Sequence, residues 1–341
     1  MLLEGKKILV TGGTGSLGKT LVYRLLTGEM GMPKEVIVFS RDEAKQHEMR
    51  LEWKHLSQAT DDVAYRGAHD LLRFQVGDVR NYNSLKRAMR GVDVVFNAAA
   101  LKQVPTCEYF PMEAVETNIY GPHNLVRTIL DSENPPQLVV GISTDKACKP
   151  INVMGMTKSL QERILIQANL ETDKTKFMCV RYGNVVASRG SVVPLFQEQI
   201  RKGGPITITL KEMTRFLLTL DQAVDTIFAA VNTGKRGETY IPQCPSAFMT
   251  DIAKLMIGDQ KIAIEYTGIR PGEKIHEILV SEEECFRTVQ RGNYYAIQSV
   301  LPELREQKDE KGGPEKEYSS GNHTIDIDSL ANLLRRAGFL T

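Results

Sequence analysis

The chain has 341 residues, with 43 Lys or Arg and 42 Asp or Glu, so its formal net charge is only +1. This length suits one large α/β unit or two joined lobes around a buried core. The balanced charge gives no electrostatic case for nucleic acid or an anionic membrane as a partner. The apolar runs are too short to span a membrane and the N-terminus lacks a signal-peptide pattern, so we predict a cytoplasmic protein.

The first half of the chain alternates short apolar runs with longer amphipathic stretches. The repeated strand-then-helix order predicts a parallel sheet with helices on both faces, and Val/Ile/Leu-rich strands fit burial on both sides. Strands are predicted at 7–10, 35–39, 73–76, 93–97, 138–142 and 177–181. Helices are predicted at 16–26, 43–55, 83–89, 118–130 and 153–168.

After about residue 182 the rhythm loosens. The charged stretch 302–321 has little periodicity, which predicts a surface loop or latch rather than a core element. The other predicted features are loops at 189–194 and 202–205 around a short helix, a helix at 221–231, a strand at 238–241, a turn-rich stretch at 268–274 and a closing helix at 325–337. We predict a main domain over 1–182, with contributions from 217–242, and a smaller lobe over 183–216 and 243–341.

The five cysteines are widely spaced and form neither a CxxC pair nor a Cys/His cluster. This pattern predicts reduced thiols. It gives no indication of a disulfide framework or a metal site.

The first predicted strand runs directly into the sequence TGGTGSLG, where the glycines are spaced GxxGxxG and a helix follows. Glycines there let the backbone turn tightly against a pyrophosphate, while the helix N-terminus offers N–H groups to the anion. This strand–turn–helix context predicts a dinucleotide site in a Rossmann-type, doubly wound α/β fold. The expected contact residues are Thr11, Gly12, Thr14, Gly15, Ser16 and Leu17.

The ends of the next strands refine the predicted cofactor site. Ser40 and Arg41 end the second strand, and a hydroxyl with a guanidinium suits a 2′-phosphate, so we predict NADP. The alternative is that Arg41 is solvated and Asp42 binds the ribose of NAD. At the following strand ends, an Asp can accept from an adenine amine and small residues let the dinucleotide lie close. These residues are Asp78, Val79, Ala98, Ala99 and Ala100.

Longer motifs carry a family resemblance. TGGTGSLG, GDVR, NAAA and TDK, followed by Lys158, resemble the extended short-chain dehydrogenase/reductase family. AALKQVPTCEYFP (99–111), STDKACKPINVMGMTK (143–158), RYGNVVASRGSVVPLF (181–196), MTRF (213–216) and RPGEK (270–274) narrow it. Together they are similar to the C5-inverting UDP-N-acetylglucosamine 4,6-dehydratases, closest to the short, soluble capsule-biosynthesis branch. The resemblance runs from about Lys6 to the closing helix.

The resemblance implies that the smaller lobe binds UDP-N-acetylglucosamine and that the sugar reacts in three steps. C4 is oxidised to a ketone, water is eliminated across C5–C6, and C6 is reduced while C5 is reprotonated on the opposite face. The product would be UDP-2-acetamido-2,6-dideoxy-β-L-arabino-hexos-4-ulose, a precursor for capsule, O-antigen or other glycan sugars. NADP would stay tightly bound and end oxidised, so it is recycled.

The elimination needs an acid for the C6 hydroxyl and a base for the C5 proton. By resemblance, Asp145 is the acid and Lys146 is the base, and Thr144 precedes them in the same motif. A lysine acts as a base only if its pKa falls through burial or a neighbouring cation. Lys102 and Lys158 are the cations expected to lower it.

Met154 departs from the Tyr-x-x-x-Lys pattern of the wider family. In that pattern the Tyr removes the C4 hydroxyl proton, and the Lys, here Lys158, holds the ribose and lowers the pKa of the Tyr. A thioether cannot act as a base. Some branches of the inverting dehydratases resemble this chain in having Met at this position. The base for the C4 hydroxyl therefore stays open among Asp145, Lys146 and a water held by Thr144.

The resemblance also implies the substrate contacts. Asn184 would reach the diphosphate, residues 189–193 would surround the uridine, and Glu273 would accept from ribose hydroxyls. Arginines would give paired N–H donors to phosphate oxygens. The full expected set is Lys102, Arg181, Asn184, Arg189, Val193, Arg215, Arg270 and Glu273, with Tyr182 on the cofactor side.

Two alternatives to the dehydratase stay open. A nucleotide-sugar 4-epimerase uses the same fold and cofactor type, but the TDK motif argues against it because an epimerase has no elimination to catalyse. A catalytically silent NADP-binding regulator is supported only by Met154. The resemblance further implies a homo-oligomer, often a hexamer, with 302–321 as a hypothetical latch between subunits, and C2 epimerisation as a second activity of some relatives.

Overall fold

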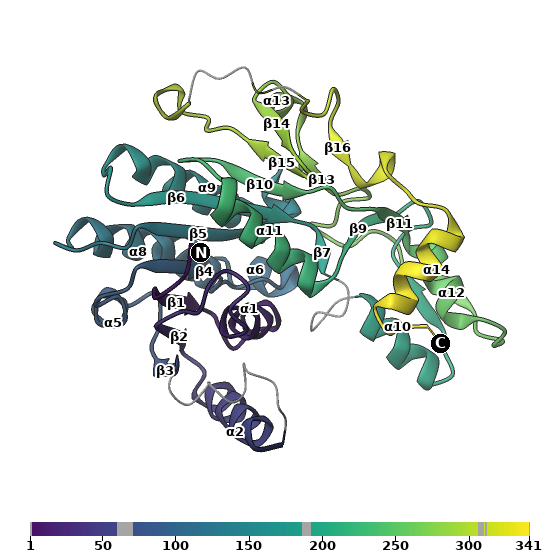
Figure 1. Cartoon of the computed structure of the whole chain (residues 1–341). Coiled ribbons are helices and arrows are strands. Elements are labelled where there is room, and N and C mark those ends of the chain that lie inside the picture. The colour runs from purple at the N-terminus through teal and green to yellow at the C-terminus, as the bar shows by residue number, and fades with distance from the viewer. Residues whose placement is uncertain (1, 60–70, 186–191, 306–309, 311, 341) are drawn as a thin grey trace.

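A nine-stranded sheet forms the centre of the computed structural model, which describes residues 2–59, 71–185, 192–305, 310 and 312–340 (Figure 1). In order across the sheet, the strands are β14 (Thr288–Arg291), β15 (Tyr294–Ile297), β10 (Thr239–Pro242), β6 (Lys176–Tyr182), β5 (Leu138–Thr144), β4 (Val94–Asn97), β1 (Lys7–Thr11), β2 (Glu35–Ser40) and β3 (Leu72–Val76). The seven strands from β10 to β3 pair in parallel, whereas β15 and β14 are antiparallel. The order 3-2-1-4-5-6 is that of a Rossmann-type sheet, so the predicted fold class is confirmed.

Helices cover both faces of this sheet. The helices α1 (Ser16–Leu26), α2 (Glu43–Ala59) and α11 (Leu220–Thr233) pack on one face, and α5 (Tyr82–Ala88), α8 (Gly121–Leu130) and α9 (Val153–Gln167) pack on the other. Successive strand residues alternate between the two cores, as Leu9 and Val10 do, because side chains of a strand point to opposite faces. Both faces of the sheet are therefore covered by apolar cores.

A smaller group of elements lies at one end of the molecule, near the C-terminus (Figure 1). Its apolar core is separate from those of the sheet and joins Phe196, Ile252 and Leu334. Its elements are α10 (Val192–Arg201), β8 (Ile206–Ile208), α12 (Met249–Ile257), β12 (Ile264–Tyr266) and α14 (Ile327–Arg336). The remaining short elements outside the central sheet are β7 (Asn184–Val185), β9 (Thr214–Leu218), β11 (Ser246–Phe248), β13 (Ile278–Val280), β16 (Tyr318–Ser319) and the helix α13 (Glu282–Cys285), which lies beside β14 (Figure 1).

The structure differs from the prediction in the helices before β5 and at one edge of the sheet. The helix predicted at 118–130 begins earlier, as α7 (Pro111–Val115), and passes through a π-helical turn (Glu116–Tyr120) before α8. The loop before it contains another short helix, α6 (Val104–Tyr109). The strands β14 and β15 were not predicted, and they bring residues assigned to the smaller lobe back to the central sheet.

The prediction that 302–321 is no core element is wrong for the end of this stretch. Tyr318 is buried, its strand β16 pairs with β13, and its hydroxyl donates to the carbonyl of Cys244 at 3.0 Å. Earlier in the stretch, Glu310 accepts from Lys235 and Arg291. The charged composition hides these anchors, which hold the stretch to its own chain. Its role between subunits stays a prediction.

The described residues contain no helix that is long and apolar enough to cross a bilayer. Within the same residues, no cluster of three or more His, Cys, Asp or Glu side chains is arranged to hold a metal ion.

Candidate functional site

The glycine turn after β1 packs directly against the end of β4. Gly12 has φ +65, and a Cβ there would lie 2.8 Å from the Cα of Ala99. A Cβ on Gly18 would lie 2.6 Å from the carbonyl oxygen of Gly12. Both positions therefore require glycine, and Gly15 then leads into α1 as its N-cap. Thr14, Ser16 and Leu17 are partly exposed along this turn.

Polar groups join the ends of β1 and β4 under this turn. The hydroxyl of Thr11 donates to Oδ1 of Asn97 at 2.8 Å and accepts from the amide of Ala99 at 3.2 Å. The Nδ2 of Asn97 and the Oγ of Ser143 are buried and have no hydrogen-bond partner among the described residues. Buried polar atoms without partners are rare, so this edge has hydrogen-bonding capacity left for a ligand. Ala98 and Ala99 are half-buried beside it, and Ala100 is exposed.

At the end of β2 the guanidinium of Arg41 is exposed, whereas the carboxylate of Asp42 is bound to a neighbouring residue. Asp42 accepts from the backbone amide of Lys45 at 3.0 Å and pairs with its ammonium at 2.6 Å, in the first turn of α2. Ser40 accepts from Gln46, whereas Arg41 is exposed. The carboxylate of Asp42 is thus engaged locally.

The adenine side of the predicted cofactor site has its own ion pair. Asp78 accepts from the backbone amide and the Nε of Arg80, both at 2.9 Å. Burial opposes ionisation there, but Arg80 outweighs it, and the pKa of Asp78 is lowered. Its neighbour Val79 is buried in the core under β2. Asp78 is therefore a carboxylate acceptor at this strand end.

Asp145 lies at the carboxyl end of β5, in the 3₁₀ turn Asp145–Ala147, and is completely buried. Its Oδ1 accepts from the hydroxyl of Thr144 at 2.8 Å and from Nζ of Lys146 at 3.1 Å. Its Oδ2 has no partner among the described residues. Burial raises the pKa of Asp145, and the carboxylate of Glu277 adds to this although Lys146 and Thr144 oppose it. The raised pKa shifts this group toward the protonated form that a general acid requires.

Lys146 is held by three oxygen acceptors. Its Nζ lies 3.1 Å from Oδ1 of Asp145, 3.1 Å from Oε1 of Glu277 and 3.3 Å from Oδ1 of Asn184. Burial acts to lower the pKa of Lys146, but the two carboxylates outweigh burial and raise it. The expectation of a lowered pKa is therefore wrong for this arrangement. Arg215 is a neighbouring cation that acts to lower the pKa of Lys146, and its effect is smaller than that of the carboxylates. Lys274 also interacts with Lys146.

The helix α9 carries the lysine of the family pattern and its missing tyrosine. Lys158 is buried, and its ammonium donates to the carbonyl of Ile142 at 2.5 Å and to Oε1 of Gln161 at 2.7 Å. Burial lowers the pKa of Lys158 to about 8. Met154 packs with Cys107 and Ala114 in a small apolar cluster, so its place in this structure is one of packing.

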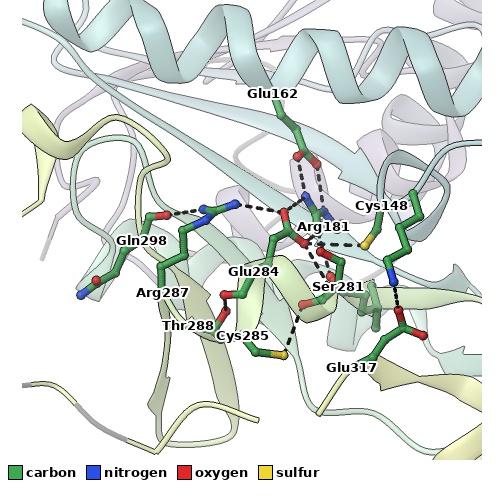
Figure 2. Close-up of polar contacts among 12 residues, drawn as sticks. Cys148, Glu162, Arg181, Ser281, Glu284, Cys285, Arg287, Thr288, Gln298 and Glu317 are labelled. Atoms are coloured by element: carbon green, nitrogen blue, oxygen red, sulfur yellow. Dashed lines mark hydrogen bonds and ion pairs between the residues drawn. The ribbon is translucent and has the colours of Figure 1, made fainter. Parts of the chain in front are cut away.

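The predicted substrate role of Arg181 is wrong in this structure. Its guanidinium is 3% exposed and donates to both oxygens of Glu162, at 3.1 and 2.7 Å, and to both oxygens of Glu284, at 3.0 and 2.7 Å. Figure 2 shows this cluster, with Glu162 on one side and Glu284 on the other. A fifth donation goes to the carbonyl of Leu279. All five N–H donors are used within the protein, which leaves none for a phosphate.

The other predicted substrate residues lie in different settings. Arg215 is buried on β9 and donates to the carbonyls of Thr214 and Ile275. Arg270 is exposed, and Glu273 accepts from the hydroxyl of Thr209 at 3.1 Å. Of these groups, Arg215 lies near the Lys146 contact, with its Nε 3.8 Å from the Oε1 of Glu277 that pairs with Lys146.

Four further predictions have distinct outcomes. Val193 is fully buried in the core of the smaller lobe, and its place in the loop around the uridine stays a prediction. Arg189 lies outside the described residues. Lys102 is exposed in the loop after β4. Tyr182 is buried at the end of β6, and burial raises the pKa of its hydroxyl.

Comparisons with known proteins agree with this architecture. The family described as polysaccharide biosynthesis protein matches residues 8–299. The chain belongs to this family. It is 44% identical over 297 residues to a protein of Rickettsia bellii (strain RML369-C) named UDP-glucose 4-epimerase, which covers 86% of this chain and 82% of that protein. The family and its named relatives place the chain among extended short-chain dehydrogenase/reductases that modify nucleotide sugars.

Two solved structures extend the comparison. The structure of Pen from Bacillus thuringiensis has a TM-score of 0.88 and 34% identity, with 100% of both chains covered. The dTDP-glucose 4,6-dehydratase DesIV from Streptomyces venezuelae, solved with NAD and TYD, has a TM-score of 0.65 and 22% identity, covering 79% of this chain and 86% of that one. The second likeness is one of fold alone.

One residue of the candidate site was not predicted from the sequence. Glu277 is 2% exposed and binds Lys146, yet it was not predicted. The only signal was its place three residues after the RPGEK motif. The same segment also contacts the loop after Asp145. Lys274 donates to the carbonyl of Cys148 at 2.5 Å, and the carbonyl of Gly272 accepts from Asn152 at 2.7 Å.

Proposed function

We propose that the protein is a C5-inverting UDP-N-acetylglucosamine 4,6-dehydratase that uses bound NADP. The observation that supports this most strongly is the Asp145–Lys146 pair at the end of β5, in which Asp145 is buried and Lys146 is partly exposed. A carboxyl group that holds its proton suits the departure of the C6 hydroxyl as water. A nucleotide-sugar 4-epimerase has no such step, although the name of the Rickettsia bellii relative makes it the second candidate.

The roles proposed for this chain's residues follow from where they lie. Asp145 donates its proton to the leaving C6 hydroxyl, and Lys146 removes the C5 proton after it has lost its own. Thr144 orients Asp145 through the 2.8 Å hydrogen bond. Asn184 and Arg270 are proposed to face the diphosphate, and Glu273 the ribose. Arg215 contributes positive charge from a buried position.

The residues after β1, β2 and β4 fit a dinucleotide. The turn at Gly12 and Gly18 leaves space for backbone only, and the buried amide of Asn97 offers a donor without a partner among the described residues. When bound, NADP supplies the chemistry of hydride exchange with the sugar. We propose that Ser40 and Arg41 hold its 2′-phosphate, because Asp42 is engaged with Lys45.

The preference for NADP can be tested at Arg41. We expect Arg41→Ala to weaken NADP binding about 10–100-fold, because hydrogen bonds to charged groups contribute about 1.5–3 kcal/mol, and to leave NAD binding nearly unchanged. Titration calorimetry with both cofactors measures this. The control is Arg73→Ala, which removes another exposed arginine, on the neighbouring strand β3. Tighter binding of NAD than of NADP by the wild type would contradict the assignment.

The reaction itself can be tested by mass spectrometry of UDP-N-acetylglucosamine incubated with the purified protein in D2O. We expect a product lighter by one water and carrying deuterium at C5, with no net change in NADPH absorbance. NMR then reports the configuration at C5, and at C2 if a second epimerisation follows. An unchanged mass with inverted C4 would establish the epimerase. No product despite tight NADP binding would favour the silent regulator.

The proposal includes a homo-oligomer, with a hexamer implied by the resemblance, in the cytoplasm. Light scattering of the purified protein measures its mass in solution and tests the oligomer directly.

A further inference from the structure

Glu277 is a buried carboxylate whose contact lies in the acid–base turn. It stands directly before β13, and its side chain is 2% exposed. Its Oε1 lies 3.1 Å from Nζ of Lys146, and its Oε2 is buried without a hydrogen-bond partner among the described residues. An ionised carboxylate is costly to bury unless cations and hydrogen bonds compensate it. A group that served only to hold the fold together would be expected to use both of its oxygens.

The charges around Glu277 come from several elements. Lys146 and Asp145 face it from the 3₁₀ turn, Arg215 faces it from β9 with Nε 3.8 Å from Oε1, and Lys274 lies in its own segment. Burial acts to raise the pKa of Glu277, but these three cations outweigh it, so the pKa is lowered. The pKa of Glu277 is therefore lowered, whereas the pKa of Asp145 is raised.

We propose that Glu277 is a positioning residue that acts through Lys146, holding its ammonium in place and accepting the proton that Lys146 must lose before it can act as the base. This inference rests on the proposed function. It accounts for a lysine that is assigned as a base and yet lies between two carboxyl groups. The unpartnered Oε2 lies on the same carboxyl group and gives the transferred proton a second oxygen to reside on.

The proton transfer balances within the site. An N–H bond of the Lys146 ammonium breaks and an O–H bond forms on Glu277, which leaves a neutral amine and a neutral carboxyl group. The amine then takes the C5 proton and becomes an ammonium again. Asp145 gives its own proton to the C6 hydroxyl, so water leaves. No oxidant or reductant takes part in these transfers.

The first test reads the lysine directly and does not depend on activity. Protein labelled with ¹³C at lysine Cε is titrated by NMR, and Lys146→Arg identifies the resonance. We expect Glu277→Gln to lower the pH at which Lys146 titrates by about 1–3, because an opposite charge at this distance favours the ammonium. An unchanged titration would overturn the proposal whatever the substrate of the enzyme.

The second test reads the pH dependence of turnover. We expect Glu277→Gln to lower kcat about 10²–10³-fold near neutral pH, because Lys146 then lacks its internal proton acceptor. The rising limb of the pH profile should move to lower pH, in step with the lowered titration of Lys146. Glu277→Asp should keep the wild-type profile with a smaller loss. The matched control is Glu238→Gln, which alters a buried glutamate paired with Arg291. Glu238 directly precedes β10, at the amino ends of the parallel strands, whereas the site lies at their carboxyl ends.

These outcomes distinguish failure of the inference about Glu277 from failure of the proposed function. If Glu277→Gln lowers kcat equally at every pH, as a structural role predicts, the inference is wrong while the dehydratase stands. If the wild type removes no water from UDP-N-acetylglucosamine, the proposed function fails, and the NMR titration still decides whether Glu277 controls Lys146. A control variant that is less stable but has an unchanged pH profile shows that destabilisation alone does not produce the effect.

Discussion

Asp145→Asn is expected to abolish the loss of water from UDP-N-acetylglucosamine, with kcat lowered about 10²–10⁴-fold. The asparagine keeps an oxygen that can accept from Thr144 and Lys146 but has no proton to give to the C6 hydroxyl. Mass spectrometry of the product measures the loss. Binding of NADP should persist, because the cofactor contacts lie on other strand ends.

Stability provides the control for this variant. Burial raises the pKa of Asp145, so the folded protein retains a proton that the unfolded chain has lost above the ordinary aspartate range near 3.8. Wild-type stability therefore falls as pH rises through that range, and the asparagine variant lacks this loss. We expect its thermal midpoint at neutral pH to equal or exceed that of the wild type. An inactive variant that is also much less stable would contradict the assigned role.

Arg181→Met is expected to destabilise the protein by about 3–5 kcal/mol, the typical result of removing one partner of a buried ion pair. Methionine approximates the length of the arginine but leaves Glu162 and Glu284 buried without their cation (Figure 2). Urea denaturation measures the change in the free energy of unfolding. A loss below about 1 kcal/mol would show that the cluster is not what stabilises this junction of α9 with α13.

A combined variant separates lost charge from lost packing. Adding Glu162→Gln and Glu284→Gln to Arg181→Met should recover part of the stability, because no buried carboxylate then lacks a partner. Acid titration is an independent check. Arg181 outweighs burial and lowers the pKa of Glu284 to about 2, so this contribution to stability is present above pH 4.5 and is lost as pH falls toward 2.

Local sequence signals predicted the first half of the fold, in which strands and helices alternate. The strand–turn–helix at Gly12 was predictable because its constraints lie within one turn. Asp145 and Lys146 were predictable as a pair because they are adjacent in a motif. The very short strands β7 and β16 have too few residues for any periodicity to appear.

What the sequence could not predict depends on partners that are distant in the chain. The pKa of Lys146 is set by Glu277, and the donors of Arg181 are used by Glu284; both carboxylates follow the turn-rich stretch 268–274. Periodicity carries no information about such pairs. Arg181 was assigned to the substrate through the family resemblance, whereas its burial appears only in the folded chain.

The segment from Arg270 to Glu277 reaches two parts of the site at once. Its first residues, Arg270 and Glu273, are proposed to hold the nucleotide, while Lys274 and Glu277 hold the turn that carries Asp145. In this arrangement the binding energy of the uridine diphosphate can align Asp145 and Lys146, which act on the distant hexose. A sugar phosphate without uridine should therefore turn over slowly even at saturation. The nucleotide part of the substrate would thus contribute to catalysis as well as to binding.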